Sequence, residues 1–192
     1  SPMSKRHHLL PSLWLMTDER LGDALLPAVR GMPRGAGIIF RHYATPAKER
    51  RRLFDDVRAM ARRRGLVLLL AGTPRQARAW KADGAHGRHH GALTAPAHDA
   101  MELHRAQAAG ARLILLSPVH ATRSHPGAAV LGPVRFGLLA RQARVPIIAL
   151  GGMTSQKFGA IARLGAAGWA GIDGLAATVG PNRRQKRKAV PR

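Results

Sequence analysis

Eight short apolar runs recur along the chain, and most are separated from the next by a stretch with helical spacing. The runs are continuous rather than alternating, which is typical of strands buried on both faces. Strand–helix alternation of this kind favours a parallel sheet. The runs lie at 13–16, 37–40, 66–71, 83–87, 92–95, 112–117, 145–150 and 168–172. Helical patterns lie near 19–30, 46–64, 74–81, 98–109, 133–143 and 154–164.

The spacing of the runs, roughly 20–30 residues, suits a compact (β/α)8 TIM barrel of the α/β class. We predict one such domain over residues 13–177, preceded by an extension over 1–12 and followed by a basic, disordered tail over 178–192. An open doubly wound sheet is the alternative fold. After Leu175 only a short apolar stretch precedes the tail, so we expect the last helix to be reduced or missing. A homodimer would cover the resulting seam.

The composition narrows the setting. The chain has no cysteine, which removes disulfides and thiolate metal sites, and no apolar run approaches the length of a membrane span. Without a secretory h-region near its start, we expect a cytoplasmic protein. The net charge of +22 attracts polyanions, and the basic tail keeps nucleic acid as an alternative partner. Aromatic residues make up only 4% of the chain, which disfavours base stacking.

The segment from Leu115 to Met153 predicts an anion-binding rim. It reads LLSPVHATRSHPG, a helical stretch, and then VPIIALGGM. A buried strand thus ends in a loop rich in hydroxyls and histidines, and the next ends in two glycines. Loops at the carboxyl ends of parallel strands form the functional face of a barrel. We therefore expect a phosphorylated small molecule as the ligand.

At this point the residues resemble a known family. The segments LWLMTD, FRHY, DGAHG, SPVHATRSHPG and ALGGM, in this order and spacing, are similar to those of the thiamine phosphate synthase and thiazole tautomerase superfamily of small barrels. The similarity runs from about residue 13 to residue 175. It implies a transferase of thiamine biosynthesis that joins a hydroxymethylpyrimidine diphosphate to a thiazole phosphate. Pyrophosphate leaves through a carbocation-like transition state, with Mg2+.

The resemblance carries over to individual residues only in part. It assigns phosphate and substrate binding to six positions: Arg41, Thr122, Ser124, His125, Gly151 and Gly152. Two carboxylates bind magnesium in the family, and neither is present here. One position holds Gly72, after Ala71, and no carboxylate lies near Gly91, where the other is expected. The pyrimidine-binding positions around Arg41 hold Ile39 and Tyr43. We therefore expect no metal ligands in the diverged active site, although the family uses Mg2+.

Other polar residues near the predicted mouth are secondary candidates: Asp18, His86, Arg88, His120 and Asp173. Asp173 replaces a hydroxyl near the phosphate site, where a carboxylate costs Coulomb energy unless it is paired or turned away. The tautomerase histidine of the family corresponds to Pro118, so that role does not transfer, and no catalytic residue is assigned. His98 is expected only to start a helix. The alternative to a synthase is a diverged barrel that binds a phosphorylated or heterocyclic molecule with different or no chemistry.

Overall fold

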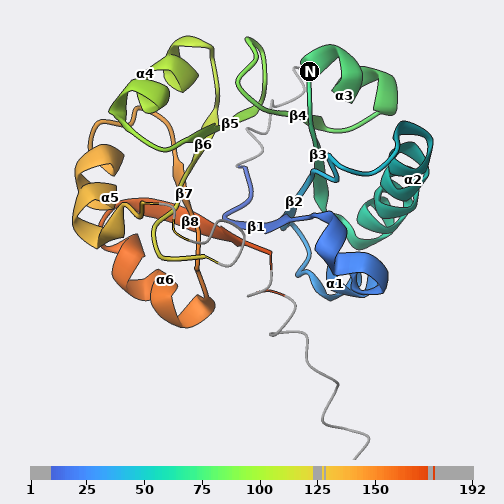
Figure 1. Cartoon of the computed structure of the whole chain (residues 1–192), viewed down its shortest axis with the longest axis horizontal. Helices are drawn as coiled ribbons and strands as arrows, with labels where there is room; N and C mark the ends of the chain where they lie inside the picture. The colour runs from blue at the N-terminus through green and yellow to red at the C-terminus, as the bar shows by residue number, and fades with distance from the viewer. Residues whose placement is uncertain (1–9, 123–126, 128, 173–174, 176–192) are drawn as a thin grey trace, which may run out of the picture.

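The strands close into a barrel in which each is parallel to its neighbours in chain order, with β8 pairing β1. The computed structural model describes residues 10–122, 127, 129–172 and 175. Figure 1 looks along the barrel, with the helices outside the ring of strands. The strands are β1 (Leu13–Met16), β2 (Gly37–Phe40), β3 (Val67–Ala71), β4 (Gly84–His86), β5 (Thr94–Ala97), β6 (Leu113–Leu116), β7 (Ile147–Leu150) and β8 (Ala166–Gly171). The (β/α)8 prediction is confirmed, and the open sheet is excluded.

The helices begin and end at ordinary capping signals. Thr73, Asp99 and Thr154 each accept a hydrogen bond from a backbone N–H in the first turn of the helix that follows. The longest helix ends at Gly65, whose left-handed φ of 64° suits the end of a helix. The helical elements are a 3-10 segment (Glu19–Ala24), α1 (Leu25–Gly31), α2 (Ala47–Arg64), α3 (Pro74–Trp80), α4 (Ala100–Ala108), α5 (Gly132–Ala140) and α6 (Ser155–Ala162).

The apolar runs are continuous because the two faces of each strand serve different cores. One face packs against the surrounding helices, with Leu15, Ile38 and Phe40 among its buried side chains. The other face fills the barrel, where Trp14 and Leu69 are fully buried. A side chain at Gly37 would collide with the Trp14 indole, its Cβ lying only 2.2 Å from a ring carbon, so this glycine makes room for the largest residue of the interior.

Several element boundaries differ from expectation, and three of the differences are informative. The helix predicted near 19–30 is split by Gly22, whose φ is 43°, and its first part is a 3-10 segment. The fifth strand, Thr94–Ala97, ends two residues beyond the predicted 92–95. The prediction ended the strand before Pro96, because proline usually marks a strand edge, but Pro96 lies inside the strand. The last strand starts earlier than predicted, at Ala166. The expected loss of the last helix falls on residues 173–192, of which only Leu175 is described.

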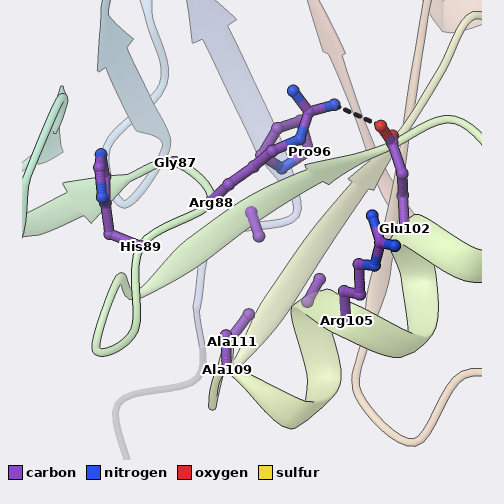
Figure 2. Close-up of a pocket in the computed structure, with 10 residues that line it drawn as sticks. Gly87, Arg88, His89, Pro96, Glu102, Arg105, Ala109 and Ala111 are labelled. Carbon is purple, nitrogen blue, oxygen red and sulfur yellow. Dashed lines mark hydrogen bonds and ion pairs between the residues drawn. The ribbon is translucent and has the colours of Figure 1, made fainter.

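The connection from β4 to β5, residues 87–93, is a loop without a helix. On the outside of the barrel this loop lies between α3 and α4 (Figure 1). These strands pair at a single register position, His86 with Thr94. Outside them lies a small pocket of about 120 Å³, partly lined by Ala95 and Ala106. Figure 2 shows Arg88 reaching past this pocket toward Glu102 on α4. Among the described helices, none is long and apolar enough to cross a membrane.

Candidate active site at the barrel mouth

A pocket of about 320 Å³ opens at the carboxyl ends of the strands, where barrel enzymes place their chemistry. Apolar side chains contribute much of its lining, and polar groups come from the end of β4 and from the loops after β2, β5, β6 and β7. The lining residues are Met16, Arg41, Tyr43, His86, Pro96, His98, Leu115, Ser117, Pro118, Thr122, Leu150, Gly151 and Ile172. An apolar base with a few convergent polar groups suits a heterocycle that carries a charged substituent.

Arg41 contributes a guanidinium group to the lining of this pocket, and contacts with residues after β1 fix its position. Its Nε donates to the carbonyl oxygen of Thr17 at 2.9 Å, and one terminal nitrogen lies 3.1 Å from an oxygen of Asp18. Burial lowers the pKa of Arg41, and the charge of Asp18 opposes this. The side chain keeps its charge at neutral pH, so Arg41 presents a fixed cation to the mouth.

Asp18 also forms an ion pair with Arg20, in which a terminal nitrogen of the arginine lies 2.7 Å from a carboxylate oxygen. Burial by itself would raise the pKa of Asp18, but hydrogen bonds from Arg20 and the charges of Arg20 and Arg41 lower it overall. The carboxylate is therefore ionised and already neutralised by two guanidinium groups. Asp18 is thus the carboxylate that pairs with Arg41. Asp173, whose pairing the sequence left open, lies outside the described residues.

The opposite side of the mouth is built around two glycines after β7. Gly151 and Gly152 have φ values of 100° and 58°, in the left-handed region that favours glycine. A Cβ on Gly152 would lie 2.5 Å from the carbonyl oxygen of Ala121, so the loop after β6 packs directly on this turn. Thr122 from that loop lines the pocket. The other loop candidates, Ser124 and His125, lie outside the described residues.

Lys157 adds a cation to this side that the sequence did not single out. Its Nζ donates to the carbonyl oxygen of Gly152 at 2.9 Å from the first turn of α6. A cation near a helix N-terminus opposes the helix dipole unless an anion is nearby. The sequence signal for this contact is the position of the lysine, three residues after the helix cap Thr154, which itself follows the paired glycines. His120 lies close by, and its buried Nε2 has no hydrogen-bond partner.

His86 lines the pocket as a neutral group. Its Nδ1 lies 2.9 Å from the hydroxyl of Thr94. Burial, and secondarily the charge of Arg41, lower its pKa to about 4. At neutral pH it therefore supplies a hydrogen-bonding group rather than a second cation.

The sequence placed His98 correctly at the start of a helix but did not predict that it also lies at the mouth. It precedes the Asp99 cap of α4, as expected, but it also lines the mouth. Its Nδ1 lies 2.6 Å from a carboxylate oxygen of Glu102. The spacing of four residues between a histidine and a glutamate at a helix start was the signal for this pair. Arg88, expected to approach the mouth, instead pairs with the other oxygen of Glu102 at 2.7 Å and borders the outer pocket (Figure 2).

The residues present do not fit a magnesium site. Magnesium prefers oxygen ligands, commonly carboxylates together with substrate phosphates. Ala71 and Gly72 close β3 without a carboxylate, and Gly91 lies in the loop after β4. Asp18 is engaged by two arginines. Within the described ranges, no three histidine, aspartate or glutamate side chains gather as a metal cluster.

The fold and this pocket define a compact (β/α)8 barrel with an open, partly apolar mouth at the carboxyl ends of its strands. A family model for thiamine monophosphate synthases matches residues 87–175. A candidate thiamine-phosphate synthase of Aquifex aeolicus is 28% identical over 179 residues, covering 85% of this chain and 96% of that protein. The thiamine-phosphate synthase of Methylococcus capsulatus is 28% identical over 174 residues, covering 80% of this chain and 77% of that protein.

Solved structures agree with the fold. Thiamine phosphate pyrophosphorylase from Pyrococcus furiosus superposes with a TM-score of 0.73 at 19% identity, covering 91% of this chain and 94% of that chain. The chain is therefore similar to thiamine phosphate synthases in part of its sequence and in its fold.

Proposed function

We propose that this protein acts in thiamine biosynthesis by binding a thiazole phosphate in the barrel mouth, as a transferase of the thiamine phosphate synthase type. The observation that carries the proposal is the glycine turn after β7: Gly151 and Thr122 line the partly apolar pocket, and Lys157 donates to the neighbouring carbonyl oxygen of Gly152. Backbone groups at a glycine turn before a helix suit a phosphate, and a lysine adds charge. The names of its relatives point to the same pathway.

The heterocycle would occupy the pocket below this phosphate site. Met16, Leu115, Leu150 and Ile172 line the pocket with apolar surface, which favours burial of a ring. Across the pocket, Arg41 is the cation positioned to receive a second anion. In the joining reaction the thiazole nitrogen bonds to the pyrimidine methylene carbon while the bond from that carbon to pyrophosphate breaks. Arg41 would stabilise the negative charge on the departing pyrophosphate.

The family's metal would neutralise that same charge when bound, and the donor set described above does not hold it. We therefore derive no step through a metal. A specific observation favours the second candidate function, a barrel that binds the phosphorylated heterocycle without joining it to a pyrimidine: neither expected metal-binding carboxylate is present.

Two measurements on the full chain separate these functions. Calorimetry with thiazole phosphate tests the binding site, and we expect a saturable complex. A turnover assay with hydroxymethylpyrimidine diphosphate and thiazole phosphate, with Mg2+ and with Mn2+, tests the transferase. Binding without product would favour the second candidate, and absence of binding would contradict both.

A further inference from the structure

The end of the barrel opposite the mouth is a basic surface. All strands are parallel, so each helix runs back from the mouth and ends at this opposite end. We call the last turns of the helices, together with the connections that lead from them into the next strands, the floor. Six exposed cations lie in the floor connections: Arg34, Lys81, Arg112, Arg141, Arg144 and Arg163. The floor is thus built from segments that are separate from the loops of the mouth.

The last turns of four helices add further cations to the floor. Helices α1 to α4 contribute six exposed side chains: Arg30, Arg62, Arg63, Arg64, Arg78 and Arg105. Cations are favoured at helix C-termini, where the helix dipole places about half a negative charge. The dipoles of α1 to α6 together amount to about three negative charges, so the floor cations outnumber what the dipoles neutralise.

Acidic residues are nearly absent from the floor. Of the ten acids in the sequence, Asp83 is the one in these segments, and its carboxylate accepts a hydrogen bond from the backbone N–H of Leu68 at 2.7 Å. None of the ion pairs among the described residues includes a floor cation. At the mouth, by contrast, Asp18 pairs with Arg20 and Arg41. The described acids therefore leave the positive charge of the floor uncompensated.

Such a surface attracts polyanions, and its other side chains decide which class of polyanion fits. Binding at a membrane surface relies on apolar side chains that insert among the lipids. Single-stranded nucleic acids are held largely by bases that stack on aromatic rings. Among the described residues, the floor has one exposed large apolar side chain, Leu138, and the others lie elsewhere: Tyr43, Met101, Val130 and Val134. The floor therefore offers many guanidinium groups and little that could insert or stack.

We propose that the floor binds the phosphate backbone of a nucleic-acid duplex without reading its sequence. Guanidinium groups match phosphate oxygens in geometry and stay charged at physiological pH. Contacts to phosphates position a protein on a duplex but carry no sequence information. The floor and the mouth lie at opposite ends of the barrel, so a bound duplex leaves the mouth open to small molecules. The inference is independent of the proposed function.

The test is the salt dependence of duplex binding. Fluorescence anisotropy of a labelled DNA duplex of random sequence is measured with the full chain between about 50 and 200 mM salt. The floor variant combines Arg63→Gln, Arg112→Gln and Arg163→Gln, which lie before three different strands. Each phosphate contact contributes about 0.9 to the slope of log affinity against log salt. We therefore expect this slope to become shallower by about 2 to 3 in the floor variant, and the affinity to fall at least about tenfold.

The matched control combines Lys48→Gln, Arg75→Gln and Arg135→Gln. These exposed cations lie in the first turns of α2, α3 and α5, at the mouth end, and their loss lowers the net charge equally. We expect the slope to change by less than about 1 in this control. If urea unfolding shows that the floor variant does not fold, Arg112→Gln alone provides the test. Arg112 lies in a connection rather than in a helix, and its loss should make the slope shallower by about 1.

The basic tail needs its own control, because its cations also attract a duplex. A tail variant of the full chain carries Arg183→Gln, Arg184→Gln, Lys186→Gln, Arg187→Gln and Lys188→Gln. We expect it to bind the duplex with a shallower slope, which the floor substitutions then reduce further. Loss of all duplex binding in the tail variant would assign the contact to the tail and contradict the proposal.

Three other results would overturn the proposal. Equal changes of slope in the floor variant and its matched control would mean that net charge, rather than the floor, governs binding. Tighter binding of a single strand of the same length would contradict a duplex partner. Vesicles of anionic phospholipid that bind the parent more tightly than the duplex, and lose this binding in the floor variant, would assign the floor to a membrane surface. Failure of thiazole phosphate to bind would contradict the proposed function alone.

Discussion

The two sides of the barrel mouth match the thiamine phosphate synthase pattern to different extents. The side after β6 and β7 has the glycine turn and Thr122, and Lys157 adds a cation. The side after β2, β3 and β4 has Arg41 but lacks the carboxylates that the resemblance implies. The family model matches only residues 87–175, which include the first side and exclude β1 to β3. Because separate loops build the two sides, a barrel of this kind can keep a phosphate site after losing a metal site.

The largest effect is expected from Gly152→Ala. A methyl group there would lie 2.5 Å from the backbone oxygen of Ala121, at a φ of 58°. Backbone cannot retreat as a flexible side chain can, so we expect a loss of at least about 2 kcal/mol of unfolding free energy from overpacking and backbone strain together. Urea unfolding measures this, and thiazole phosphate binding should be lost with it.

Gly110→Ala provides the control for this first prediction. Gly110 also has a left-handed φ, 86°, but open space surrounds the position of its missing Cβ. It should cost only the backbone strain, about 1 kcal/mol. Equal losses in the two variants would mean that the β6 loop does not pack on the glycine turn as described.

The second prediction concerns acid. His86 titrates near pH 4 when folded and near its ordinary pKa of 6.5 when unfolded. Between these values the unfolded chain binds more protons, so stability should fall as the pH falls from about 6.5 to about 4, by up to about 3 kcal/mol. Burial lowers the pKa of His42 and His120 as well, which adds to the same slope.

His86→Asn removes the titrating group, and we expect it to flatten this slope in urea unfolding curves recorded across the interval. His104→Asn, on the outer face of α4, is the control. A slope that is identical in the parent and in His86→Asn would show that the imidazole is not buried in neutral form.

The third prediction compares which anion each side of the mouth binds. Arg41→Gln should weaken pyrophosphate binding roughly tenfold, the scale of one charge-assisted contact, and change thiazole phosphate binding much less. Lys157→Gln should show the opposite preference. Calorimetry with both ligands on both variants gives the comparison. Parallel losses for both ligands in each variant would mean that one shared anion site, rather than two sides, receives them.

The smallest effect concerns magnesium. In the parent, Mg2+ should leave pyrophosphate affinity nearly unchanged once binding of the metal by free pyrophosphate is taken into account. The variant Gly72→Asp places a carboxylate directly after β3, at one of the two positions where the resemblance implies a metal ligand. We expect it to gain a weak dependence on Mg2+, because a carboxylate oxygen is a ligand that Mg2+ prefers. A strong Mg2+ dependence in the parent would contradict the loss of the metal side.

The sequence predicted the barrel because apolar continuity and spacing depend on local pattern. It placed Arg41, Thr122 and Gly151 at the mouth because strand ends in a parallel barrel share one edge. It missed what depends on side-chain direction across loops. Arg88, which was predicted near the mouth, pairs with Glu102 instead. His98, which was predicted only to start a helix, lines the mouth. Pro96 hid the extent of β5, because a proline inside a strand is indistinguishable from one that ends it until the register is known.

The most direct test of the account is a calorimetric titration of the full chain with thiazole phosphate, performed once with a chelator and once with Mg2+. If the phosphate side is retained and the metal side is lost, the ligand binds in both and the dissociation constants agree within about twofold, a difference below 0.5 kcal/mol. Binding that appears only with Mg2+ would contradict the account, because the mouth would then hold a metal that its described side chains do not provide for.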